Sequence, residues 1–166
     1  VESFLGGDLE SAFEDLVSSS GRWRVRRRFL ELGLERGLVD AERLLEFALR
    51  DSDQWIRVRS GRELMGSPSP EVLGALLASP SVDVRRDALV AAPGELLSDE
   101  ALRALLVDRS PRVREEAVAR ASKRWSVAET YRAAASSDPT PQVLAACLDG
   151  LARVGDATDL DLAIEA

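Results

Sequence analysis

Apolar residues recur three and four positions apart along most of the chain. They do so in the runs 9–17, 40–49, 69–79, 98–108 and 126–136, and again in 157–166. This spacing gathers apolar side chains on one face of a helix, and the runs are rich in the strong helix formers Leu, Ala, Glu and Arg. All seven prolines lie between helical runs or in the first turn of one. The pattern predicts an all-α protein.

A second set of helical segments alternates with these runs and repeats about every thirty residues. In each segment a leading β-branched residue is followed four positions later by a second core residue. The pairs are Val25 with Phe29, Ile56 with Ser60, Val84 with Ala88, Val113 with Ala117, and Val143 with Cys147. Successive leading residues are therefore 31, 28, 29 and 30 positions apart.

We call the first set A segments and the second set B segments. Together they predict five A–B helix pairs plus a sixth A helix, in one repeat domain over residues 1–166. The repeats are expected at 1–36, 37–65, 66–92, 93–124 and 125–154, with a partial one at 155–166. Helix pairs this short bury their apolar faces only by packing on neighbouring pairs.

An acidic turn residue stands six positions before an arginine that follows the leading residue, in "DSDQWIR" (51–57) and "DRSPRVR" (108–114). This pattern resembles HEAT repeats, most closely the short bacterial subclass that includes bilin-lyase-type repeats. The resemblance implies a right-handed α-α superhelix with the B helices on its concave side. It also implies a partial ladder in which Asp51 pairs with Arg57 and Asp108 with Arg114. The other repeats keep one member each: Arg85 opposite Ser79, Arg26 opposite Ser20, and Asp138 opposite Leu144.

The ends of the chain predict that it is part of a longer protein. Residue 1 is Val, and the last A segment, 157–166, has no B partner to cover its leucines. No apolar run approaches the ~20 residues of a membrane-spanning helix, and the first residues lack the features of a secretory signal. We expect a cytoplasmic protein.

The composition argues against catalysis. The chain has no histidine, and its single cysteine, Cys147, falls in a core position, so we expect it to be buried. No phosphate-binding or nucleophile-elbow motif occurs, and no pair stands out among the 29 acidic residues. We predict no enzyme activity, no cofactor and no metal. The alternatives that the resemblance keeps open are a lyase subunit, which would need a partner subunit, and a DNA glycosylase.

Charge divides between the two kinds of segment. The B segments 22–36, 54–65, 82–91, 111–124 and 141–154 carry a net charge of +9, and the remainder carries −16, within a total of −7. If the B helices line one face, as the resemblance implies, that face is basic and the opposite face acidic.

The positive charge is concentrated in the first three repeats. Glu115 and Glu116 interrupt it in the fourth repeat, and Ala145 and Ala146 in the fifth. Arginines at the ladder position are expected to be structural. Tryptophans at helix starts either fill contacts between repeats or serve as anchors for a partner. The predicted partner-binding residues are Arg22, Trp23, Arg24, Arg27, Arg28, Trp55, Arg59, Arg62 and Arg86.

Two functions fit this face. The first is a non-catalytic scaffold or adaptor that binds an acidic protein partner. The alternative is DNA binding through phosphate contacts, in the manner of the HEAT-like alkylpurine DNA glycosylases. We expect Arg22, Arg24, Arg27 and Arg28 to be free to meet a partner. If this face binds that partner, reversing Arg27 and Arg28 to Glu should abolish its capture and leave stability nearly unchanged.

Overall fold

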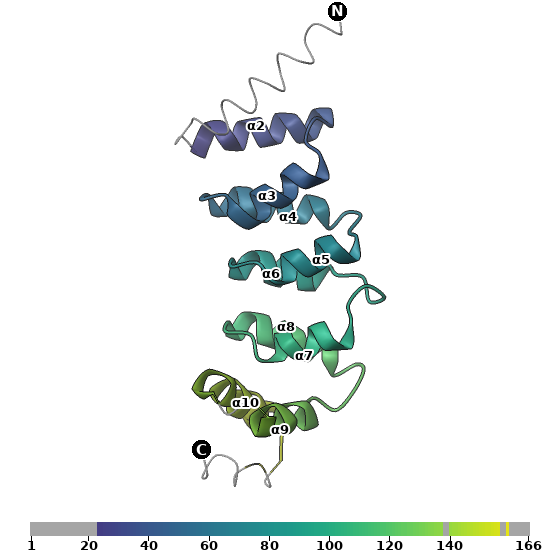
Figure 1. The fold of residues 1–166 in the computed structure, drawn as a ribbon, viewed down its shortest axis with the longest axis vertical. Coiled ribbons are helices and arrows are strands. Elements are labelled where there is room, and N and C mark those ends of the chain that lie inside the picture. The colour runs from purple at the N-terminus through teal and green to yellow at the C-terminus, as the bar shows by residue number, and fades with distance from the viewer. Residues whose placement is uncertain (1–22, 138–139, 157–158, 160–166) are drawn as a thin grey trace, which may run out of the picture. The chain divides into compact units, whose positions relative to one another are not determined.

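The computed structural model describes residues 23–137, 140–156 and 159, which form helices joined by short turns, with no strand among them (Figure 1). The helices are α2 (Trp23–Arg36), α3 (Ala41–Arg50), α4 (Gln54–Leu64), α5 (Pro70–Leu77), α6 (Val82–Ala91), α7 (Asp99–Leu106), α8 (Pro111–Ala121), α9 (Val127–Ser137) and α10 (Pro141–Val154). The predicted all-α class is confirmed for this part of the chain. The expected helix at 9–17, and that at 157–166 apart from Asp159, lie outside the described residues. None of the helices described here has the length and apolarity needed to cross a bilayer.

Short polar residues fix where several helices begin and end. Four side chains accept a hydrogen bond from the backbone N–H three residues later and so cap α3, α4, α5 and α7: Asp40, Asp53, Ser69 and Ser98. At the end of α2, Gly37 adopts a left-handed conformation with φ of 66°. Two turn hydrogen bonds close that helix, from Gly37 N to Leu34 O and from Leu38 N to Gly33 O.

The chain divides into two compact units, residues 1–87 and 88–166, with the boundary inside α6. In the N-terminal unit α3 packs on α4, α2 on α4, and α3 on α5. In the C-terminal unit α7 packs on α8, and α9 on α10. Consecutive helices of the sequence thus pair within each unit, and in the N-terminal unit neighbouring helices of the same kind also touch.

The leading residues of the middle repeats form the core as predicted. Ile56, Val84 and Val113 are buried, as are the residues four positions after them and Cys147. The first repeat differs from the prediction, because Val25 and Phe29 are only partly buried. The buried residues of α2 are Leu30 and Gly33, so the face of the helix that packs on the core is the one that carries these two residues. Val143 of α10 is likewise only partly buried.

Candidate functional site

The arginines predicted to meet a partner lie on α2, α4 and the first turns of α6, all within the N-terminal unit. Arg22 lies outside the described residues. Of the others, Arg27 is fixed by hydrogen bonds that it donates to a neighbouring turn, and the remaining arginines lie at or near the surface.

Arg27 is held by two hydrogen bonds to one carboxylate. Its Nε and Nη2 atoms donate to the two carboxylate oxygens of Asp53 at 3.0 and 3.1 Å. The guanidinium carbon also lies 4.5 Å from the ring centre of Trp23 and 5.1 Å from that of Trp55. A bidentate pair stacked on two indoles fixes the side chain in one position. The expectation that Arg27 has no internal partner is therefore wrong.

Asp53 serves two helices at once, because its carboxylate also accepts a hydrogen bond from the Ile56 amide and caps α4. Burial acts to raise the pKa of Asp53, but hydrogen bonds from Arg27 and from the Ile56 and Trp55 amides hold that pKa below the ordinary 3.8. The carboxylate is thus ionised at neutral pH and ties α2 to the start of α4.

Arg26 is held in a similar way by Asp51, which lies two residues before Asp53 in the same turn. It donates to both carboxylate oxygens of Asp51, at 3.2 and 3.1 Å, and to the Ser52 hydroxyl at 2.9 Å. Asp51 was expected to pair with Arg57 through its side chain. Arg57 instead donates to the main-chain carbonyl of Asp51 at 2.6 Å, while the Asp51 carboxylate accepts from Arg26.

The bond to a turn carbonyl recurs along the chain. Arg85 donates to Ser79 O at 2.7 Å, and Arg114 to Asp108 O at 3.0 Å. Because the acceptor is backbone, the arginine needs no Asp six positions before it. The contact therefore does not depend on the residue six positions before the arginine, since Asp51 and Ser79 both offer their main-chain carbonyl.

The remaining arginines are held loosely or have no ion pair. Arg28 pairs with Glu31 and Arg59 with Glu63 on the same helix, and Arg62 pairs with Asp87, all near the surface. Exposed pairs contribute about 0.2–1 kcal/mol, so a carboxylate from a partner can replace them. Arg24 and Arg86 are exposed and form no ion pair with any residue in the described ranges.

The two tryptophans of this region differ in exposure. Trp55 is partly buried beneath Arg27. Trp23 is 43% exposed and also carries the guanidinium of Arg24, 5.0 Å from its ring centre. We give the name arginine face to the exposed Trp23, Arg24, Arg28, Arg62 and Arg86 together with the half-buried Arg59, on α2, α4 and α6.

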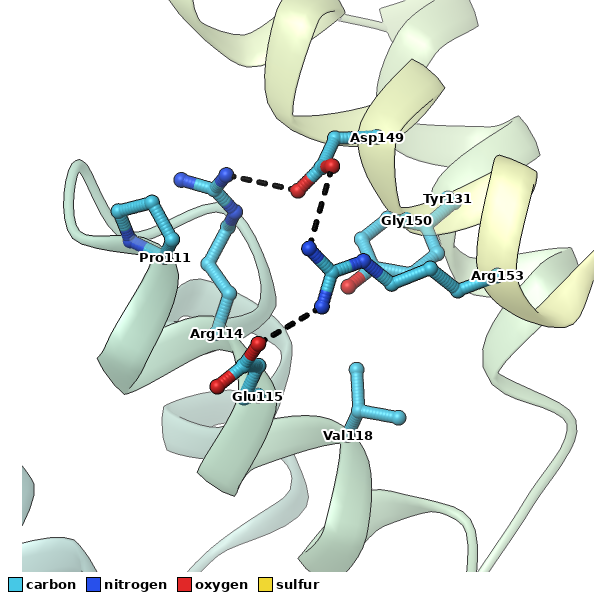
Figure 2. Close-up of a pocket in the computed structure, with 8 residues that line it drawn as sticks. All are labelled: Pro111, Arg114, Glu115, Val118, Tyr131, Asp149, Gly150 and Arg153. Carbon is cyan, nitrogen blue, oxygen red and sulfur yellow. Dashed lines mark hydrogen bonds and ion pairs between the residues drawn. The ribbon is translucent and has the colours of Figure 1, made fainter.

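A second cluster, which the sequence analysis missed, lies in the C-terminal unit (Figure 2). It surrounds a small pocket of about 110 Å³ lined by Pro111, Arg114, Glu115, Val118, Tyr131, Asp149, Gly150 and Arg153. Arg114 Nη2 donates to Asp149 Oδ2 at 2.9 Å, and Arg153 Nη1 donates to Glu115 Oε1 at 2.8 Å. Arg153 Nη2 also reaches Asp149 Oδ1 at 3.4 Å, which closes a chain of alternating charges. Glu115, expected only to interrupt the basic face, is part of this network.

Tyr131 and Gly150 form the inner wall of the pocket. Tyr131 is 1% exposed, and burial raises the pKa of its hydroxyl to about 12. A Cβ atom at position 150 would lie 2.3 Å from Cζ and Cε2 of the Tyr131 ring. The absence of a side chain at Gly150 is what lets the ring lie against α10. A glycine inside a helix and the single tyrosine of the chain were the available sequence signals, but neither belongs to a recognisable motif.

Comparisons with family models, with curated proteins and with solved structures returned no match. In the ranges that the structure describes, no group of three or more His, Cys, Asp or Glu residues is placed to hold a metal ion. The geometry of the arginine face and of the C-terminal pocket therefore carries the functional argument.

Proposed function

We propose that the chain is a HEAT-like helical-repeat module that binds an acidic segment of a partner protein, without catalysis, through the arginine face. The observation that carries the proposal is the division of the arginines. Arg26 and Arg27 form bidentate pairs with carboxylates, whereas the neighbouring Arg24 and Arg28 stay exposed, Arg24 against the ring of Trp23. An exposed indole on the same helix as exposed arginines matches the anchors that dominate protein interfaces.

Two features support the repeat assignment. Consecutive helices pair within each compact unit, and the repeat distance stays close to thirty residues. The arginine after the leading residue donates to the turn carbonyl six residues earlier in three successive repeats, at Arg57, Arg85 and Arg114. A superhelix of the HEAT kind, with the arginine face on its inner side, is the arrangement that we infer from this regularity.

The charges on the face favour a protein over DNA. Its five arginines are interspersed with three carboxylates, those of Glu31, Glu63 and Asp87. Duplex DNA presents an unbroken line of phosphates, about one charge per 1.7 Å, and these carboxylates would repel it. A peptide with separated acidic side chains and an aromatic or aliphatic residue can instead pair with the arginines and cover Trp23.

Fluorescence polarisation tests the proposal. The probes are a labelled peptide that alternates acidic and aromatic residues and a labelled DNA duplex, each at low and moderate salt. We expect peptide binding that Arg24→Glu with Arg28→Glu weakens at least about tenfold, because two attractive charges become repulsive. Circular dichroism melting should show little change in stability, since both residues are exposed.

The matched control is Arg50→Glu with Lys123→Glu. Both residues are exposed, Arg50 on α3 and Lys123 after α8, and neither has a hydrogen bond or ion pair with a described residue. The control changes the net charge by the same amount and should leave peptide affinity almost unaltered. Equal losses in the two double variants would contradict a specific face. Binding of DNA but not of peptide, with a steep salt dependence, would instead establish the nucleic-acid alternative.

A further inference from the structure

The pocket between α8, α9 and α10 is bordered by a tyrosine hydroxyl that has no hydrogen bond within the described ranges. The residue is Tyr131, which is 1% exposed. Its hydroxyl-bearing carbon lies against Gly150, which lines the pocket, and the oxygen is turned into the space that Arg114, Glu115 and Val118 border (Figure 2). The oxygen therefore borders the pocket and can donate its proton to an acceptor that enters there.

The rest of the pocket has more donors than acceptors. Arg114 donates to Asp108 O and Asp149, and Arg153 donates to Glu115 and Asp149. Each guanidinium carries further N–H groups beyond these. Both carboxylate oxygens of Asp149 accept a bond from an arginine, and Glu115 Oε1 accepts one from Arg153.

The protonation states agree with this surplus of donors. Burial keeps the pKa of Tyr131 at about 12, so the phenol retains its proton at neutral pH and donates. The hydrogen bond from Arg114 lowers the pKa of Asp149, which stays ionised and keeps the two guanidinium groups in place.

We propose that this pocket is a binding site for one carboxylate group, which accepts from the Tyr131 hydroxyl and from the guanidinium of Arg153. The volume of about 110 Å³ suits a carboxylate with one or two methylenes. It is well below the roughly 300–1,000 Å³ of pockets that enclose a drug-sized ligand. The side chains of Val118 and Pro111 offer apolar contact to the methylenes. This site lies in the C-terminal unit and does not depend on the arginine face.

The group could come from a small free acid or from a peptide, and the test separates these sources. Tyr131 is the only tyrosine in the chain, so ring-¹³C tyrosine labelling gives signals from this residue alone. The probes are succinate, a peptide with one internal Asp and a blocked C-terminus, and a neutral peptide with a free C-terminal carboxylate. Succinamide and sodium chloride at matched ionic strength are the controls.

We expect a saturable shift of the Tyr131 signals with at least one carboxylate probe and none with succinamide. Saturation by succinate assigns the site to small acids, whereas saturation by one peptide alone assigns it to that group of a partner. No saturable shift with any carboxylate overturns the proposal, as does an equal shift with succinamide.

Two substitutions separate binding from a structural role. Tyr131→Phe keeps the ring on Gly150 but removes the donor, and calorimetry should show binding about tenfold weaker. Glu115→Gln removes a charge that competes for Arg153, and the Tyr131 signals should show tighter binding by a few fold. Affinity that neither substitution changes would overturn the assignment of the site.

Discussion

Helix α2 carries both a firmly held and an exposed arginine, whereas the arginines that line the pocket on α8 and α10 are both paired across helices. On α2, Arg27 is fixed by a carboxylate from the start of α4, while Arg28 meets only Glu31 of its own helix and stays 64% exposed at its side chain. On α8 and α10, Arg114 and Arg153 take carboxylates from each other's helix, and the four groups close around Tyr131.

The difference shows that the location of the acid and the burial of the arginine together decide how firmly a guanidinium is held. A carboxylate from a neighbouring helix or turn orders the guanidinium where the arginine is partly buried, as at Arg26 and Arg27, whereas Arg62 stays exposed although Asp87 lies on α6. A carboxylate supplied from the same helix leaves the guanidinium near solvent, where it can exchange partners. The N-terminal unit therefore keeps an open arginine face, and the C-terminal unit encloses a pocket.

The largest expected effect comes from filling the space beneath Tyr131. Gly150→Ala places a Cβ 2.3 Å from the ring and must displace either α10 or the tyrosine. We expect a loss of about 3 kcal/mol in the free energy of unfolding, measured by urea denaturation. Gly74→Ala is the control, because nothing lies within 4 Å of its added Cβ on α5. That variant should be more stable by about 0.5–1 kcal/mol, and equal effects at both glycines would mean that the ring does not rest on α10.

The next effect separates the two kinds of arginine on one helix. Arg27→Ala removes a bidentate pair and two ring contacts, and leaves the Asp53 charge without its partner. We expect a loss of about 1–2 kcal/mol in unfolding free energy. Arg28→Ala should change it by less than about 0.5 kcal/mol. A similar cost for the two substitutions would remove the distinction between held and exposed arginines.

A smaller effect should follow from pH. The pKa of folded Asp53 lies below 3.8, so the stability that the ionised carboxylate adds is present above that pH and is lost as the pH falls through the folded-state value. Asp53→Asn retains a capping side chain but removes the charge. The difference in unfolding free energy between wild type and Asp53→Asn should therefore be full at about pH 7 and should shrink as the pH falls below 3.8 through the folded-state pKa. A difference that stays the same across this pH range would show that the charge does not contribute.

Helix positions could be predicted from sequence because apolar spacing and capping residues act locally. The run expected at 40–49 became α3 (Ala41–Arg50), and the segment expected at 54–65 became α4 (Gln54–Leu64). The segment expected at 111–124 ends earlier, since α8 stops at Ala121 and Arg124 turns back to the carbonyls of Gly94 and Leu97.

The pairing of side chains between helices could not be predicted in the same way. Arg27 and Asp53 are 26 positions apart, and their contact depends on how α2 is rotated against α4. The stacking of Tyr131 on Gly150 likewise depends on the packing of α9 against α10. The partner-binding role of the arginine face remains a prediction, since it requires a second molecule.

¹⁵Nε relaxation of the wild-type protein measures directly which arginine side chains are held and which are mobile. Arg26 and Arg27 donate through Nε to Asp51 and Asp53, whereas Arg24 and Arg28 form no such bond with a described residue. We expect side-chain Nε order parameters near 0.8 or above for Arg26 and Arg27, and below about 0.6 for Arg24 and Arg28. Equal order in all four side chains would contradict this expectation, because α2 would then present no mobile arginines to a partner.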